Sequence, residues 1–193
     1  MGMKFVRQKD NRSKAHWVLD SFQSSDHEQY PHTVMWGNIS TVNSYAKPIL
    51  FTDMPYFNRW MGDNRDSCHW RVIPNAVHIN ETGDFPDDRF RSLGVEVMDW
   101  KTGGTHVLVC PSSLAMEQCY KEEYWLDRTV EELKKHTDRP IRVRHKPRKD
   151  GVSGPRAADV PFAEDCKDAW AIVTLASIAG VEAACLGVPV FSH

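Results

Sequence analysis

Five basic side chains lie within eight residues in the second half of the chain, and they could bind a phosphate group. They are Arg142, Arg144, Lys146, Arg148 and Lys149. If this segment is a strand, the first three share one face, because side chains alternate along a strand. Arginine offers phosphate oxygens a planar fork and lysine a mobile point charge, so Arg144 and Lys146 are candidate ligands of a diphosphate. A solvated edge strand or a contact with a nucleic-acid backbone would give the same pattern.

Two hydroxyl residues and one carboxylate lie near the C-terminal end of the sequence. Thr174 and Ser177 follow an apolar run at 169–173 and precede a segment rich in Ala and Gly that ends at Gly187. At the start of such a helix, free N–H groups and the helix dipole bind phosphate, although the same hydroxyls could simply cap the helix. Glu182 lies among apolar residues on this predicted helix, which we expect to be mostly buried. A buried carboxylate needs a hydrogen-bond partner, either a ligand hydroxyl or a neighbouring loop.

Three side chains in the first half could accept a proton from a substrate. Asp53 lies at the carboxyl end of a predicted strand at 48–53, and His78 and Glu81 belong to the segment His78-Ile-Asn-Glu81. Histidine and carboxylates are common general bases. We therefore take Asp53, His78 and Glu81 as candidate catalytic residues, with Asp53 first. Each of them could instead stabilise a turn or cap a helix.

Apolar and alternating segments predict the elements that position these residues. In the first half we expect strands at 16–19, 33–37, 48–53 and 70–73. In the second half we expect strands at 106–110, 141–144 and 169–173, a helix over 117–136, a helical turn over 161–168, and a helix and a strand on either side of Gly187. The order β–α–β–α–β–α–β from residue 106 onward is that of a doubly wound α/β half. The turn at 101–104 divides the chain into halves of 1–104 and 105–193.

The predicted topology selects one rim of the second sheet as a binding site. Ligands of open parallel sheets bind outside the carboxyl ends of the strands. The residues that follow the three strands of the second half are Ser112 and Ser113, His145 and Lys146, and Thr174 and Ser177. We expect these residues to converge on one rim.

Composition narrows the class of protein. The 193 residues carry a net charge of −2, with 41% hydrophobic and 26% charged residues, which is an ordinary globular balance. The five cysteines form no C-x-x-C pair, and reduced thiols in a cytoplasmic protein are the simplest interpretation. No segment is long and apolar enough to predict a membrane span, and no histidine or carboxylate cluster has metal-binding spacing.

The segment Glu182-Ala-x-x-x-Gly187-x-Pro189-Val190, preceded by Val-Thr174-x-x-Ser177, resembles the donor-binding half of GT-B glycosyltransferases. It is most similar to the capsular-polysaccharide type and to compact versions encoded by some bacterial viruses. A looser likeness extends upstream through 142–147, Trp36-Gly37 and Asp53-x-x-Tyr56.

This resemblance implies an α/β fold of GT-B type, with Rossmann-type parallel sheets. A small N-terminal acceptor half would precede a clearer C-terminal donor-binding half, shortened at its end. The implied activity is transfer of a sugar from a nucleotide-sugar donor to an acceptor hydroxyl, with no metal and no cofactor besides this co-substrate. Glu182 would bind the donor ribose, and Arg144 and Lys146 its diphosphate. The acceptor would be a polysaccharide, or a hydroxymethylated base in the DNA of a bacterial virus, in which case the protein would act in the host cytoplasm.

Two other classes of protein are compatible with the same residues. A catalytically inactive nucleotide- or partner-binding protein could retain the fold, and the short chain, which stops at His193 directly after a predicted strand, favours this alternative. A DNA-binding module could use the basic segment, although the net charge of −2 gives it little support.

Overall fold

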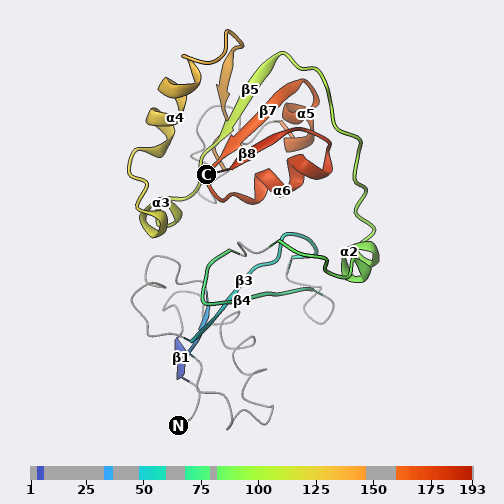
Figure 1. Cartoon of the computed structure of the whole chain (residues 1–193), viewed down its shortest axis with the longest axis vertical. Coiled ribbons are helices and arrows are strands. Elements are labelled where there is room, and N and C mark those ends of the chain that lie inside the picture. The colour runs from blue at the N-terminus through green and yellow to red at the C-terminus, as the bar shows by residue number, and fades with distance from the viewer. Residues whose placement is uncertain are drawn as a thin grey trace. The chain divides into compact units, whose positions relative to one another are not determined.

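The computed structural model describes residues 4–6, 33–36, 48–59, 68–78, 82–146 and 160–192. The chain divides into two compact units, Met1–Arg89 (unit 1) and Phe90–His193 (unit 2), which are described separately here (Figure 1). The predicted strand at 16–19 and the candidate residue Glu81 lie outside the described residues. The division of labour between an acceptor half and a donor half stays a prediction.

Unit 1 is built on a four-stranded sheet in the order β1-β2-β3-β4. Its strands are β1 (Lys4–Val6), β2 (Thr33–Trp36), β3 (Ile49–Asp53) and β4 (Arg71–Pro74). The strands expected at 33–37, 48–53 and 70–73 are thereby confirmed. The first three strands are parallel, whereas β4 pairs with β3 in the antiparallel direction. The amino end of β4 therefore lies beside the carboxyl end of β3, where Arg71 is the register partner of Asp53.

The core of unit 1 comes from the two inner strands. Val34, Met35 and Trp36 are all buried although they are consecutive, which means that β2 is covered on both faces. Asn75 joins the end of β4 to the start of β3, because its side-chain oxygen accepts from the Ile49 N–H at 3.0 Å and its own N–H donates to the Ile49 carbonyl at 2.8 Å.

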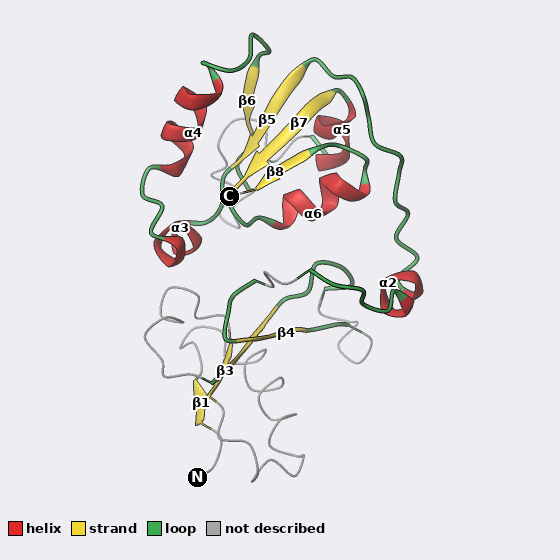
Figure 2. Ribbon diagram, viewed as in Figure 1, coloured by secondary structure: helices red, strands yellow, loops and turns green. Residues whose placement is uncertain are grey.

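Unit 2 holds a parallel sheet in the order β6-β5-β7-β8 (Figure 2). A short helix, α2 (Asp88–Ser92), spans the boundary between the units. The elements that follow are β5 (His106–Cys110), α3 (Leu114–Tyr120), α4 (Trp125–Leu133), β6 (Ile141–Val143), α5 (Phe162–Lys167), β7 (Ala169–Thr174), α6 (Ile178–Cys185) and β8 (Val190–Ser192). The predicted β–α–β–α–β–α–β order is confirmed. After β5 the chain adds β6 on one side and then β7 on the other, so the topological switch point lies between the carboxyl ends of β5 and β7.

The single helix expected over 117–136 is wrong, because two helices occupy this region. Helix α3 begins earlier, at Leu114, and ends where Lys121 adopts a left-handed backbone with φ of 59°. Tyr124 is also left-handed, with φ of 56°, and directly precedes α4. A right-handed helix cannot continue through such residues. Trp125, Leu126, Val130 and Leu133, whose helical spacing suggested one helix, all belong to α4.

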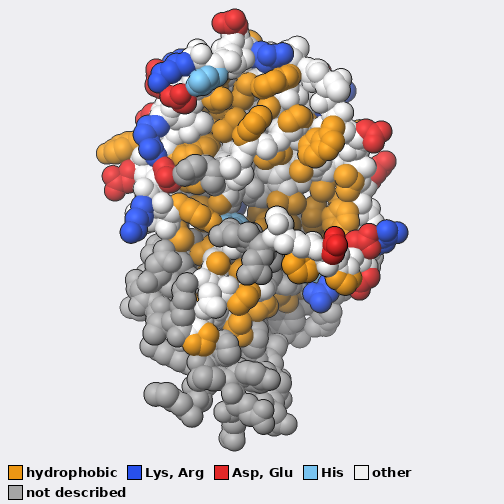
Figure 3. Space-filling view, in the orientation of Figure 1, with side chains coloured by type: hydrophobic (Ala, Val, Ile, Leu, Met, Phe, Trp, Pro, Cys, Tyr) orange, Lys and Arg blue, Asp and Glu red, His pale blue; other side chains and the backbone are white. Residues whose placement is uncertain are grey.

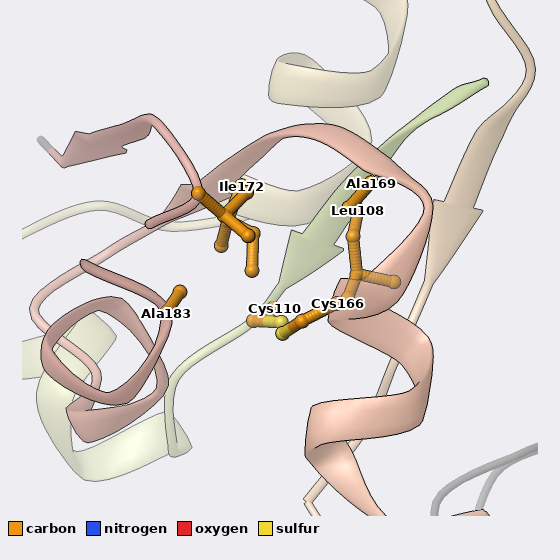
Figure 4. Packing of buried hydrophobic residues seen from close by; sticks show 7 residues of the cluster. Leu108, Cys110, Cys166, Ala169, Ile172 and Ala183 are labelled. Carbon is orange, nitrogen blue, oxygen red and sulfur yellow. The ribbon is translucent and has the colours of Figure 1, made fainter. Parts of the chain in front are cut away.

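Helices cover both faces of the sheet of unit 2. Val107 and Val109 of β5 pack with Trp125 of α4, whereas the alternate residues Leu108 and Cys110 belong to the cluster on the opposite face. Figure 4 shows this second cluster, in which side chains of the sheet meet Cys166 of α5 and Ala183 of α6.

Small residues let α6 lie close to the sheet, as its sequence predicts. A Cβ at Gly180 would lie 3.2 Å from Thr174 Cγ2 and 3.3 Å from Val190 Cγ1. Gly187 follows the helix with φ of +73°, and a Cβ there would lie only 2.1 Å from the carbonyl oxygen of Asp99. The Lys101 N–H donates to the Gly187 carbonyl at 2.7 Å, so residues 98–101, which we call the Asp99 segment, pack against the C-terminal end of α6.

Candidate functional site

The topological switch point of unit 2 brings two predicted hydroxyl positions together. Ser112, which follows β5, donates a hydrogen bond to the Leu175 carbonyl beyond β7. Thr174, at the end of β7, is buried and donates to the Cys110 carbonyl of β5 at 2.7 Å. These two bonds hold the loops after β5 and β7 against each other, and the Thr174 hydroxyl is used within the protein.

Ser177 is the N-cap of α6. Its hydroxyl oxygen accepts from the Ala179 N–H at 3.3 Å, and its carbonyl accepts from the Gly180 N–H at 3.0 Å. Ala176, directly before it, has a φ of 47°, a left-handed conformation that costs an alanine about 1–2 kcal/mol. The capping interpretation of Ser177 therefore applies, and phosphate binding at this helix start stays a prediction.

Arg144 is engaged inside the protein. Its guanidinium forms an ion pair with Asp165 of α5, and the exposed fractions of the two side chains are only 10% and 6%. A second nitrogen donates to the Val160 carbonyl at 2.8 Å, and the Phe162 ring lies 5.6 Å away. Arg144 thus joins the end of β6 to the start of α5, and a role toward a diphosphate stays a prediction.

The other two donor-site candidates are more accessible. Lys146 is exposed, two residues beyond Arg144. Glu182 is half-buried, and only Gly180 and Ala183 of α6 are fully buried. Every residue of α6 is buried or half-buried, in agreement with the expectation, and the helix packs on the sheet with its small residues. Because Glu182 itself is only half-buried, burial alone does not demand a ligand for it.

Unit 1 brings two candidate catalytic residues into one hydrogen-bonded cluster. Arg71 of β4 donates to Asp53 Oδ2 at 3.0 Å through one terminal nitrogen. Its other terminal nitrogen lies 2.9 Å from the Tyr56 hydroxyl and 3.1 Å from His78 Nδ1. The Tyr56 hydroxyl and His78 Nδ1 are 3.3 Å apart. We call these four residues the Arg71 cluster.

The charge state of His78 follows from this environment. Burial, and next the positive charge of Arg71, lower the pKa of His78 from 6.5 to about 4. The imidazole is therefore neutral near pH 7. A guanidinium can only donate hydrogen bonds, so Nδ1 accepts and the ring proton lies on Nε2.

Two cysteines of unit 2 are chemically inert. Burial raises the pKa of Cys110 and of Cys166 to about 12, so both remain thiols at neutral pH. All five cysteines are free of disulfide bonds. Within the described segments, no three His, Cys, Asp or Glu side chains converge in a way that could hold a metal ion. None of the helices described here combines the length and the hydrophobicity that a membrane span requires.

A groove of about 670 Å³ lies between α4 and the last two strands of unit 2. Trp125, Val173 and Phe191 supply apolar surface, and its rim is charged, with pairs such as Lys135–Glu132 at 2.8 Å. In Figure 3, apolar side chains extend over the face of unit 2 and charged side chains line its edge. None of the predicted site residues lines this groove, so it is distinct from the predicted donor site.

Comparison with known proteins concerns the fold. No protein-family model matches the chain, and no curated protein matches it in sequence. A solved structure of Thermosulfurimonas dismutans KpsC, a beta Kdo 2,7 transferase, is similar with a TM-score of 0.50 and 14% identity, covering 91% of this chain and 68% of that one. The fold is GT-B-like. The predicted α/β class with Rossmann-type parallel strands is confirmed, and the likeness says nothing about individual site residues.

Sequence reasoning missed Arg71, Tyr56 and Asp165 as partners of the candidate residues. Arg71 lies opposite Asp53 only because β4 runs antiparallel to β3, and the sequence gives no sign of that direction. Asp165 lies in a short helix whose composition resembles any exposed turn. One signal was available for Tyr56, which belongs to the Asp53-x-x-Tyr56 pattern.

Proposed function

We propose that this protein transfers a sugar from a nucleotide-sugar donor to an acceptor hydroxyl. The observation that carries the proposal is the parallel β6-β5-β7-β8 sheet, whose switch point lies beside the start of the small-residue helix α6. Nucleotides bind at this place in doubly wound folds. The similarity of the fold to that of a beta Kdo 2,7 transferase supports the same class of activity.

In this proposal the donor lies at the carboxyl rim of unit 2. The positive end of the helix dipole at the start of α6, near Thr174 and Ser177, attracts phosphate oxygens together with the exposed ammonium of Lys146. Arg144 is paired with Asp165 in this structure, and would contact the diphosphate only after releasing that carboxylate. Glu182, half-buried in the middle of α6, accepts hydrogen bonds from the ribose hydroxyls.

The acceptor is activated in unit 1. In an inverting reaction Asp53 takes the proton of the acceptor hydroxyl, and the hydroxyl oxygen bonds to the anomeric carbon of the sugar. The bond from this carbon to the donor phosphate oxygen breaks, and its electron pair leaves with the nucleotide. Positive charge at the donor phosphates stabilises that leaving group.

A thermal-shift screen with UDP, GDP, CMP, ADP, dTDP and their sugars tests the donor site. A ligand at about 100 times its dissociation constant adds roughly 2.7 kcal/mol of stability. For a protein of this size that raises the Tm by about 5–10 °C. Lys146→Ala should weaken binding at least tenfold, because a hydrogen bond to a charged group contributes about 1.5–3 kcal/mol. Lys134→Ala, an exposed lysine on another helix, is the matched control and should bind normally.

Arg144→Ala is a poor probe of binding, because it leaves Asp165 buried without its partner and lowers stability by itself. A nucleotide that shifts the Tm is then assayed for transfer, with Kdo as the first sugar and saccharide or hydroxymethylated-DNA acceptors. No shift with any nucleotide would contradict the proposal. Binding without transfer to any acceptor would instead support an inactive nucleotide-binding protein.

A further inference from the structure

Arg71 is the residue that joins the candidate catalytic groups of unit 1. Its guanidinium contacts Asp53, Tyr56 and His78 at 2.9–3.1 Å, and its side chain is only 10% exposed. The Tyr56 ring also lies 5.0 Å from the guanidinium carbon. A planar group with fixed donor directions, held in place by three partners, orients those partners as well.

His78 faces two groups at Nδ1, the Arg71 guanidinium and the Tyr56 hydroxyl. Because Arg71 can only donate, Nδ1 must supply its lone pair, and the proton of the neutral ring lies on Nε2. A second proton would have to enter at Nδ1, break the bond from Arg71 and place two positive charges in contact. His78 is therefore held as a neutral ring, with its Nδ1 lone pair occupied by Arg71, and is a poor base.

Asp53, in contrast to His78, is a carboxylate that accepts hydrogen bonds through both side-chain oxygens. Its Oδ2 accepts from Arg71 at 3.0 Å and its Oδ1 accepts from the Met54 N–H at 2.7 Å, so the carboxylate plane is fixed at both oxygens. Each oxygen has a second lone pair available for a proton. Its side chain is 22% exposed, about twice the fraction of Arg71, so a substrate can reach the carboxylate more easily than the guanidinium.

We propose that Arg71 is a positioning residue, which orients Asp53 as the group that takes the acceptor proton and holds His78 as a neutral ring with its proton on Nε2. The inference rests on the proposed sugar transfer. Of the two candidates in the described part of unit 1, it assigns the proton transfer to Asp53. The acceptor hydroxyl gives its proton to Asp53 as its oxygen bonds to the sugar, and the electron pair of the broken bond leaves on the donor phosphate.

The arrangement of His78 is tested first, without any activity assay. Protein labelled with ¹⁵N in its histidine rings is titrated by NMR, and the His78 signals are assigned from their loss in His78→Gln. In the wild type we expect a proton on Nε2, none on Nδ1, and no titration between pH 5 and 8. A His78 that titrates near its ordinary pKa of about 6.5, or that carries its proton on Nδ1, would overturn the proposal.

Two variants then test Arg71 itself. Arg71→Met removes the charge and the donors, and the pKa of His78 should rise part of the way, because burial, the larger cause of its lowering, remains. Arg71→Lys keeps the charge and protects the fold but cannot reach all three partners. His69→Gln, an exposed histidine of unit 1 paired with Asn58, is the matched control and should leave the His78 spectrum unchanged. An unchanged His78 in Arg71→Met would refute the role of Arg71.

Activity separates this inference from the function on which it rests. With an active donor, Arg71→Lys should lower kcat about 100-fold with little change in the KM of the donor, because a positioned base contributes 10²–10⁴-fold. Asp53→Asn should lower kcat at least as much. If Asp53→Asn keeps its turnover and His78→Gln loses it, the assignment of Asp53 as the group that takes the acceptor proton is wrong. Absence of turnover in the wild type would refute the sugar transfer and the role of Asp53, whereas the NMR result would still decide how Arg71 holds His78.

Discussion

Replacing glycines by alanine at three positions of unit 2 separates backbone strain from steric clash. Gly187 combines a φ of +73° with a carbonyl oxygen that would lie 2.1 Å from an added Cβ. Gly94 has a similar φ of +63° but no atom within 4 Å of that position. Gly103 has an ordinary φ and equally open surroundings. The same Gly→Ala change therefore causes a steric clash together with backbone strain at Gly187, backbone strain alone at Gly94, and neither at Gly103.

The magnitudes follow from these surroundings. Alanine in the left-handed region costs about 1–2 kcal/mol, so Gly94→Ala should lose about that much stability and Gly103→Ala almost none. Gly187→Ala should also displace the Asp99 segment, which is held by hydrogen bonds of 2.8 Å at Met98 and 2.7 Å at Lys101. With about 1 kcal/mol for each bond, the total is about 3–4 kcal/mol. For the unfolding of a unit of about 100 residues, the corresponding fall in Tm is roughly 12–32 °C.

Calorimetry and urea unfolding of the three variants provide the assay. All three positions lie in unit 2, so one unfolding transition reports on the whole series. An equal loss in the free energy of unfolding for Gly187→Ala and Gly94→Ala would show that the Asp99 segment does not pack tightly against Gly187. The argument from packing would then be wrong. A loss for Gly103→Ala of the same size would refute the argument from strain as well.

Three further predictions concern buried polar groups and thiols. Arg144→Ala should destabilise unit 2 by about 3–5 kcal/mol, because the Asp165 carboxylate remains buried without its ion pair, and Asp165→Leu in the same chain should recover much of this loss in urea unfolding. If the double variant is as unstable as the single one, the unpaired carboxylate is not the cause. The pKa of His78 is lower in the folded protein, about 4, than the 6.5 of an unfolded chain, so its contribution to stability is complete above pH 6.5 and is lost as the pH falls toward 4. Denaturation curves at several pH values should show this fall in the free energy of unfolding, and the fall should be smaller in His78→Gln. An equal pH dependence in the variant would assign the fall in stability to other groups. Cys110 and Cys166 should resist iodoacetamide at pH 8 until the protein unfolds, and rapid labelling of either in the folded state, detected by mass spectrometry, would contradict their burial.

The sequence predicted the central strands of unit 2 well, because β5 and β7 are short, mostly apolar runs that are largely buried. The residues of β5 are all buried, which is why its sequence is continuously apolar. The helix between 117 and 136 was harder, because its interruption depends on left-handed Lys121 and Tyr124. Neither is a glycine or asparagine, so local sequence gives no signal for this conformation.

The site was predicted less completely than the fold, because its contacts join distant segments. Asp53 and His78 were candidates on their own chemistry, but the arginine that relates them lies on a strand whose direction only the structure reveals. In the same way Arg144 looked available as one of a row of basic residues, whereas a carboxylate 21 positions later in the chain engages it. Side-chain type predicts which groups could react, and long-range pairing decides which remain available.

The threonines at the strand ends illustrate how this pairing changes the donor site. Thr52 in unit 1 donates to the Met35 carbonyl, and Thr174 in unit 2 donates to the Cys110 carbonyl, both at 2.7 Å and both from a buried side chain. In each sheet the hydroxyl satisfies a carbonyl of the neighbouring parallel strand. A polar residue at the carboxyl end of a strand is therefore no evidence of a ligand until this use is excluded. Because the Ser177 and Thr174 hydroxyls both have partners inside unit 2, the phosphate site we propose depends on the dipole of α6 and on Lys146. Lys146→Ala should therefore weaken nucleotide binding more than Thr174→Val does.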